Sequence, residues 1–274
     1  MAEVIVVTSG KGGVGKTTSS ASIASGLALS GYKTAVVDFD IGLRNLDLVL
    51  GCERRAVYDI INVIHGEAKL SQALIKDKKC ANLFILPASQ TRDKNALTTA
   101  GVSLIINELK EQFDYIICDS PAGIEHGALS AMFHADQAII VTNPEISSVR
   151  DSDRILGLLA SKTERAQNQD SPIKEHLLIT RYDQKRVRKG EMLDIDDIIE
   201  ILSIPLLGII PESPAILRSS NIGCPVIHDT KSSAAKAYLS AVNKLLGNKA
   251  PQPVKNGHFD FLNKLLSGFK KAEA

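Results

Sequence analysis

Short runs of β-branched and other apolar residues recur along the chain, separated by longer stretches in which apolar residues return every three or four positions. The short runs predict strands at residues 3–8, 34–38, 83–86, 115–119, 137–142, 176–180 and 206–210. Most of them are continuously apolar, as expected of strands that helices cover on both faces. The longer stretches predict helices at residues 17–30, 95–113 and 147–161. This alternation predicts an α/β fold, with a doubly wound, mostly parallel sheet flanked by helices.

The pattern changes after Gly247. Residues 248–257 are rich in proline, glycine and lysine and offer almost nothing to bury, which indicates a flexible linker. Residues 258–274 become apolar again. We therefore expect one large domain at 1–247, a linker at 248–257 and a terminal helix at 258–274.

The terminal segment is amphipathic. At about 100° per residue, its apolar residues fall on one half of the helical wheel and its polar residues on the other. It is too short to span a bilayer, but it suits a helix lying among lipid headgroups. Residues 248–274 carry five lysines against two acids, which favours an anionic membrane over the alternative of an ordinary helix packed on the domain. The expected membrane contacts are Phe259, Phe261, Leu262, Lys264, Leu265, Leu266, Phe269 and Lys270.

Composition and charge add few constraints. The chain has 274 residues and a formal net charge of +1, so any nucleic-acid site would have to be local. The basic cluster at 182–191 is one candidate, although a solvated loop explains it as well. The four cysteines, at 52, 80, 118 and 224, lie far apart, which indicates reduced, buried thiols rather than a metal site. With neither a secretory signal nor a run of about 18–20 apolar residues, we expect a cytoplasmic protein.

A glycine-rich loop lies between the first predicted strand and helix. Residues 10–18 read GKGGVGKTT and match the phosphate-binding pattern G-x-x-x-x-G-K-[ST]. The glycines let backbone N–H groups approach phosphate oxygens, and the helix N-terminus adds partial positive charge. The pattern needs only Lys16, so Lys11 is a second cation at the entrance.

Acidic residues end two of the predicted strands. Asp38 and Asp40 follow one apolar run and Asp119 ends another. Because ligands of parallel sheets collect at the carboxyl ends of strands, all three acids are expected to face the same phosphates and metal. Asp38 or Asp40 taken singly could instead be a helix cap or a turn former.

Four segments together resemble the MinD/ParA family of P-loop ATPases, whose deviant Walker A loop carries a lysine after its first glycine. They are residues 10–18, 38–55, 118–125 and 142–157. The resemblance runs from residue 3 to about 245 and continues in the tail, where the family has a membrane-targeting helix. It implies a P-loop fold and Mg²⁺-dependent ATP hydrolysis.

The resemblance also implies roles for individual residues. Lys16 would contact the β- and γ-phosphates, and Asp40 would orient the attacking water. Lys11 would reach the nucleotide of a second subunit, so the catalytic set is Lys11, Lys16 and Asp40. The implied metal set is Thr17, Asp38 and Asp119. The implied nucleotide contacts are Gly10, Lys11, Gly12, Gly13, Val14, Gly15, Lys16, Thr17, Thr18, Asn45 (beside Arg44 in switch I), Arg181, Pro211 and Glu212.

By the same resemblance, the protein places the division septum. ATP would join two copies, the dimer would bind the inner face of the cell membrane reversibly, and it would recruit a division inhibitor, MinC. A topological factor, MinE, would stimulate hydrolysis and release.

A DNA- or cargo-partitioning ATPase of ParA type remains the alternative. An iron–sulfur protein would need closely paired cysteines, and a tyrosine kinase of similar loop type would carry tyrosines in its tail.

Overall fold

The computed structural model describes residues 2–92 and 96–247, and within them it has one eight-stranded sheet in the order β3-β4-β2-β5-β1-β6-β7-β8. Neighbouring strands are parallel except β3 and β4. The strands are β1 Glu3–Thr8, β2 Thr34–Asp38, β3 Ile75–Lys76, β4 Leu83–Leu86, β5 Tyr115–Asp119, β6 Gln137–Thr142, β7 Lys174–Tyr182 and β8 Leu206–Pro211. The predicted fold class is confirmed.

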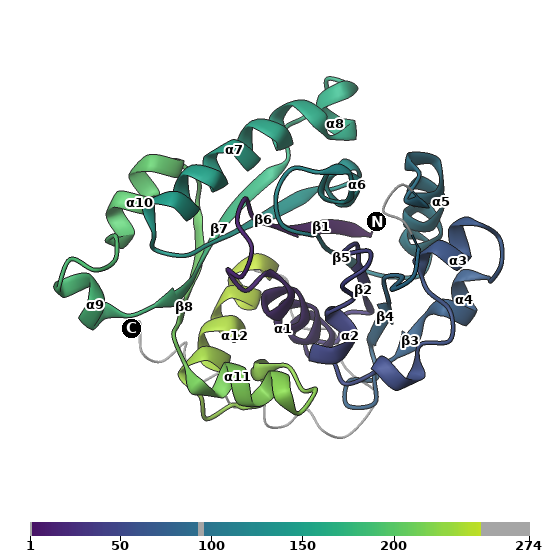
Figure 1. Cartoon of the computed structure of the whole chain (residues 1–274), viewed down its shortest axis with the longest axis horizontal. Coiled ribbons are helices and arrows are strands. Elements are labelled where there is room, and N and C mark those ends of the chain that lie inside the picture. Colours follow the sequence, from purple (N-terminus) through teal and green to yellow (C-terminus); the bar gives the residue numbers. More distant parts are fainter. Residues whose placement is uncertain (1, 93–95, 248–274) are drawn as a thin grey trace.

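Helices cover both faces of this sheet (Figure 1). One face carries α1 Lys16–Leu29, α2 Leu46–Val49, α11 Pro214–Asn221 and α12 Ser233–Leu246. The other carries α3 Ile60–Ile64, α5 Thr99–Lys110, α6 His126–Phe133, α7 Ile146–Lys162 and α10 Ile195–Leu202. Shorter helical elements are η1 Glu53–Arg55, α4 Leu70–Ala73, α8 Glu164–Gln167, α9 Gln184–Arg188 and η3 Val226–His228.

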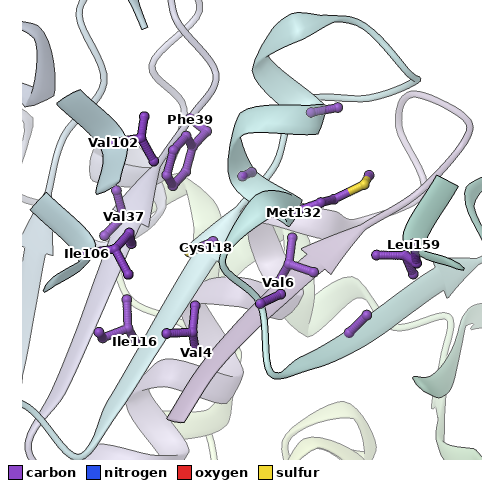
Figure 2. Close-up of a cluster of buried hydrophobic side chains, with 14 of the residues drawn as sticks. Val4, Val6, Val37, Phe39, Val102, Ile106, Ile116, Cys118, Met132 and Leu159 are labelled. Carbon is purple, nitrogen blue, oxygen red and sulfur yellow. The ribbon is translucent and has the colours of Figure 1, made fainter. Parts of the chain in front are cut away.

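The two-sided cover explains why the strands are continuously apolar. Along β1, Val4 and Val6 belong to the core on the α5–α6–α7 side, whereas Ile5 and Val7 belong to the core on the α1–α12 side. All four side chains are fully buried. Figure 2 shows Val4 and Val6 in one cluster with Ile116 and Cys118 of the neighbouring strand β5 and with Met132 of α6. Since residues on both sides of β1 are covered from Val4 onward, the alternating pattern of a one-sided sheet is absent from this strand.

The predicted elements differ from the observed ones at their ends. The helix expected over 95–113 begins at Thr99, because the Thr98 side chain caps it by accepting a hydrogen bond from the N–H of Gly101. Strand β7 is longer than predicted, and β3 was not predicted. The linker at 248–257 and the terminal helix at 258–274 lie outside the described residues.

Three of the cysteines are buried, as predicted, and Cys224 is partly buried. Burial raises the pKa of the Cys118 thiol to about 12, so this side chain stays neutral in the core. In the described residues, no helix combines the length and the apolar character that crossing a bilayer requires.

Helix α1 packs directly against α12 through a glycine. A Cβ added at Gly26 would lie 2.7 Å from Cδ1 of Ile227 and 2.7 Å from Cγ2 of Val242. A buried hydrogen bond of 2.9 Å also joins the hydroxyls of Ser19 and Tyr238. The phosphate-loop helix and the last described helix therefore form one closely packed pair.

Gly26→Val is expected to lower the free energy of unfolding by about 1–3 kcal/mol, because the new side chain would overpack this contact. Urea denaturation measures the loss. Gly157→Val is the matched control: Gly157 also lies within a helix, but no described atom comes within 4 Å of a Cβ added there. Equal stability of the two variants would contradict the packing argument.

Candidate nucleotide site

The phosphate loop connects β1 to α1 and forms one wall of a cavity of about 600 Å³ at the carboxyl ends of the strands. The loop was predicted at this place. The cavity is lined by Gly12, Gly13, Gly15, Lys16, Thr17, Thr18, Phe39, Asp40, Ile41, Leu43, Asn45, Val49, Leu97, Ser120, Pro121, Ala122, Glu125, Gly127 and Arg181. Its volume is within the range of small-molecule sites.

The loop glycines have different reasons for being glycine. Gly13 and Gly15 adopt φ values of +74° and +95°, a left-handed conformation that other residues rarely take. A Cβ at Gly12 would lie 3.9 Å from Cβ of Ala122, an ordinary contact. A Cβ at Gly10 would lie 2.3 Å from the backbone oxygen of Asp151, so this glycine admits α7 against the loop. Gly10 therefore serves packing, and the structure does not place it in the cavity wall.

Lys16 is the buried cation of the cavity wall. It is only 7% exposed, and its Nζ donates a 2.8 Å hydrogen bond to Oγ of Ser9. Burial lowers the pKa of Lys16, while the charges of Asp119 and Asp40 act in the opposite direction. A cation held among these acids, at the N-terminus of α1, is placed to meet phosphate oxygens.

Asp119 and Asp38 lie side by side at the ends of β5 and β2, where they are in register. Both are buried, and neither lines the cavity. Burial raises the pKa of Asp119 to about 6, and hydrogen bonds from Ser20 and Thr17 oppose the rise. Burial and the charge of Asp119 also raise the pKa of Asp38. The two carboxylates form an acidic layer directly behind the phosphate-binding wall.

Only Asp40 of the three predicted acids reaches the cavity wall. The carboxylate of Asp38 instead accepts hydrogen bonds from the backbone N–H of Asp40 (2.9 Å) and of Leu46 (3.3 Å). These bonds hold the segment that follows β2. The prediction that all three acids face the phosphates is therefore too simple, because Asp38 faces its own chain.

The switch segment after β2 places Asn45 at the cavity, as predicted. Its neighbour Arg44 has a φ of +47° and points elsewhere: Nε donates to Asp47 at 2.5 Å, and the guanidinium also donates to the carbonyl oxygen of Glu53. Arg44 therefore contacts its own loop here.

Lys11 lies outside the lining of its own cavity. Its Nζ is 2.8 Å from Oε2 of Glu145 and 3.1 Å from Oγ of Ser147, at the start of α7. The Lys11 and Glu145 side chains are 39% and 52% exposed, so the pair contributes little to stability. In the single subunit, Lys11 therefore pairs with an acid of its own chain.

The expected adenosine contacts are only partly brought to the cavity. Arg181 lines it, whereas Pro211 and Glu212 at the end of β8 do not, among the residues that the structure describes. Val14 is buried, and its carbonyl oxygen accepts a 2.6 Å hydrogen bond from Oγ1 of Thr180. Val14 thus fixes the loop to β7 instead of facing a ligand.

Several lining residues were not predicted. Ser120, Pro121, Ala122 and Glu125 follow Asp119 closely. The segment 118–125 carries part of the family resemblance, but only its acid was assigned a role. They would have been found by including the residues that directly follow each predicted strand among the candidates for the site. Leu97 belongs to a distant part of the chain, and no sequence signal marks it.

The residues present fit a magnesium nucleotide. Hydroxyl and carboxylate oxygens are hard ligands of the kind that Mg²⁺ prefers. The cation would favour the charged forms of Asp38 and Asp119, whose pKa values are raised by burial and, to a lesser extent, by neighbouring carboxylates. Thr17 and Asp119 would hold the ion or its water shell. When bound, it would neutralise developing charge on the phosphates.

A phosphate loop between the first strand and helix of a parallel sheet, with acids at two neighbouring strand ends, defines a P-loop nucleoside triphosphatase. Residues 2–171 match the family described as AAA domain. Among curated proteins, the septum site-determining protein MinD of Neisseria meningitidis is 64% identical, with 98% of this chain and 100% of the relative covered.

Two solved structures are also similar. The MinC:MinD cell division protein complex of Aquifex aeolicus has a TM-score of 0.78 at 42% identity, covering 93% of this chain and 99% of that chain. The septum site-determining protein MinD of Pyrococcus horikoshii, complexed with Mg-ADP, has a TM-score of 0.79 at 31% identity, covering 89% and 96%. The chain belongs to the MinD family of septum site-determining ATPases, which use ATP and Mg²⁺.

Proposed function

We propose that ATP joins two copies of this ATPase and that the pairing switches its attachment to the membrane during septum placement. The observation that carries the proposal is the position of Lys11. Its ammonium lies near the entrance loop but outside the cavity of its own subunit. A cation supplied by a second subunit would stabilise charge on the terminal phosphate, as arginine fingers do in trans.

The membrane contact is assigned to residues 258–274, which lie outside the described residues. Six large apolar side chains at about 1.5–3 kcal/mol each give a gross gain on the order of 10 kcal/mol on insertion. Ordering a helix of this length costs a comparable amount. One tail would therefore bind weakly, whereas two tails on one dimer would gain affinity through effective concentration.

MinC is the proposed partner for recruitment, supported by the complex that the Aquifex aeolicus relative forms with it. MinE is proposed as the activator on the family resemblance. The cytoplasmic side of the cell membrane is the proposed location, with reversible peripheral attachment.

A nucleic-acid partner is not proposed. The basic cluster at 182–191 forms α9 and its flanks, and Arg186 within it pairs with Glu191 at 3.1 Å. The identity of 64% to a septum site-determining protein favours septum placement over the partitioning alternative.

Vesicle sedimentation tests the proposal. With anionic vesicles, the protein is expected to pellet in ATP and to stay largely in the supernatant in ADP. Phe261→Asp should abolish pelleting, because it places a charge on the apolar half of the terminal segment; ending the chain at Gly257 should do the same. Asn263→Asp, which adds the same charge on the polar half, is the matched control and should weaken pelleting only modestly. Equal pelleting in ADP and ATP would contradict the proposed switch.

A further inference from the structure

Ser20 reaches the acidic layer behind the phosphate-binding wall. It lies on α1, three residues after Thr17, and its Oγ donates a 2.6 Å hydrogen bond to Oδ1 of Asp119. Ser20 is fully buried and Asp119 is 1% exposed. Residues three apart share a helix face, so α1 presents two hydroxyls in succession toward this carboxylate.

The contact is specific to this position among the serines of α1. Ser22 and Ser25 are equally buried, yet their hydroxyls have no hydrogen-bond partner among the described residues. Ser19 pairs with Tyr238, on the side of α12. Burial on this helix is therefore not sufficient for a serine to hydrogen-bond to Asp119.

The geometry limits how Asp119 can turn. Asp119 ends β5 between β1 and β2, in register with Val7 and Asp38. With Oδ1 held by Ser20 and a further hydrogen bond from Thr17, the orientation of the Asp119 carboxylate is restricted. A second carboxylate, Asp38, lies beside it, so a freely rotating Asp119 would have competing orientations.

We propose that Ser20 is a positioning residue, which holds the Asp119 carboxylate in the orientation that Mg²⁺ requires. The role acts through Asp119 and involves no contact with nucleotide. It rests on the assignment of Asp119 as the metal acid, and it is independent of dimerisation and of the membrane. Removing a residue that hydrogen-bonds to a metal ligand commonly lowers metal affinity by about 10–100-fold.

The test measures binding of a fluorescent ADP to the full-length protein while Mg²⁺ is varied. Ser20→Ala is expected to raise the half-saturating Mg²⁺ concentration about tenfold. Its affinity for the same nucleotide in EDTA should stay within about twofold of the wild type, since the phosphate loop is untouched. Ser22→Ala, the same substitution on the same helix, should change neither value. The proposal would be overturned if Ser20→Ala had the half-saturating Mg²⁺ concentration of the wild type. It would also be overturned if Ser20→Ala lost as much nucleotide affinity in EDTA as it loses in Mg²⁺.

A second comparison separates Ser20 from its premise. Asp119→Asn alone should raise the half-saturating Mg²⁺ concentration. Adding Ser20→Ala to it should raise this concentration no further, because the effect of the serine passes through the carboxylate. If the effects of the two substitutions on the half-saturating Mg²⁺ concentration were additive in the double variant, the positioning role would be overturned. An Asp119→Asn variant with unchanged Mg²⁺ dependence would overturn the assignment of the acid instead, whatever Ser20→Ala does.

Discussion

Lys11→Ala is expected to leave the protein monomeric in the presence of a slowly hydrolysed ATP analogue, whereas the wild type becomes dimeric. Lys11 does not line the cavity of its own subunit, so a single subunit should bind nucleotide about as well without it. Across a dimer, by contrast, the triphosphate would lose the additional cation that the second subunit supplies. Light scattering after size-exclusion chromatography gives the mass. ATP hydrolysis should fall by about 10³–10⁵-fold, the effect found for cations supplied in trans.

The control for this experiment is Lys236→Ala, which removes an exposed lysine of α12, far from the phosphate loop in sequence. It should dimerise like the wild type. A Lys11→Ala protein that is still dimeric with bound analogue would refute the role in trans. A monomeric protein that has also lost nucleotide binding would instead assign Lys11 to its own site.

Asp40→Ala is expected to keep nucleotide binding and to lose turnover by about 10²–10⁴-fold, the range found when a group that assists proton transfer is removed. Asp40 lines the cavity together with Lys16, and its charge acts on that lysine. Its carboxylate therefore lies at the cavity where the phosphates would bind, outside the loop that would hold them. Phosphate release measures turnover, and a fluorescent ATP measures binding.

Asp197→Ala, on the exposed surface of α10, removes a carboxylate outside the lining of the cavity and should hydrolyse ATP normally. Asp40→Asn should be nearly as impaired as Asp40→Ala, because an amide cannot take a proton from water. Phosphate release at the wild-type rate from either Asp40 variant would show that the water is oriented by another group.

The strands and the phosphate loop were predictable because their signals are local. A continuous apolar run needs cover on both faces, and the glycine pattern needs only nine consecutive residues. Strand β3 has two residues, Ile75 and Lys76, and pairs antiparallel at the edge of the sheet. A segment of this length has no periodicity to detect, so tertiary pairing alone defines it.

The site was predictable in its residue types but less so in their contacts. Asp38 was expected to face the metal, yet its oxygens hold the backbone of its own switch segment, because the chain turns back toward them after β2. Lys11 meets Glu145, which is 134 positions away. Contacts of this range depend on how α7 packs on the loop at Gly10, and only the folded chain reveals them.

The close fit of α12 on α1 at Gly26 has a consequence for signalling. Phosphates would meet the first turn of α1, and the chain continues from α12 into the terminal segment after Leu246. With Ile227 and Val242 seated against Gly26, sliding or bending between the two helices would be sterically costly. We therefore expect the nucleotide state to change how many terminal segments one assembly carries, one in a monomer and two in a dimer. We do not expect it to distort α12, the helix that precedes the terminal segment.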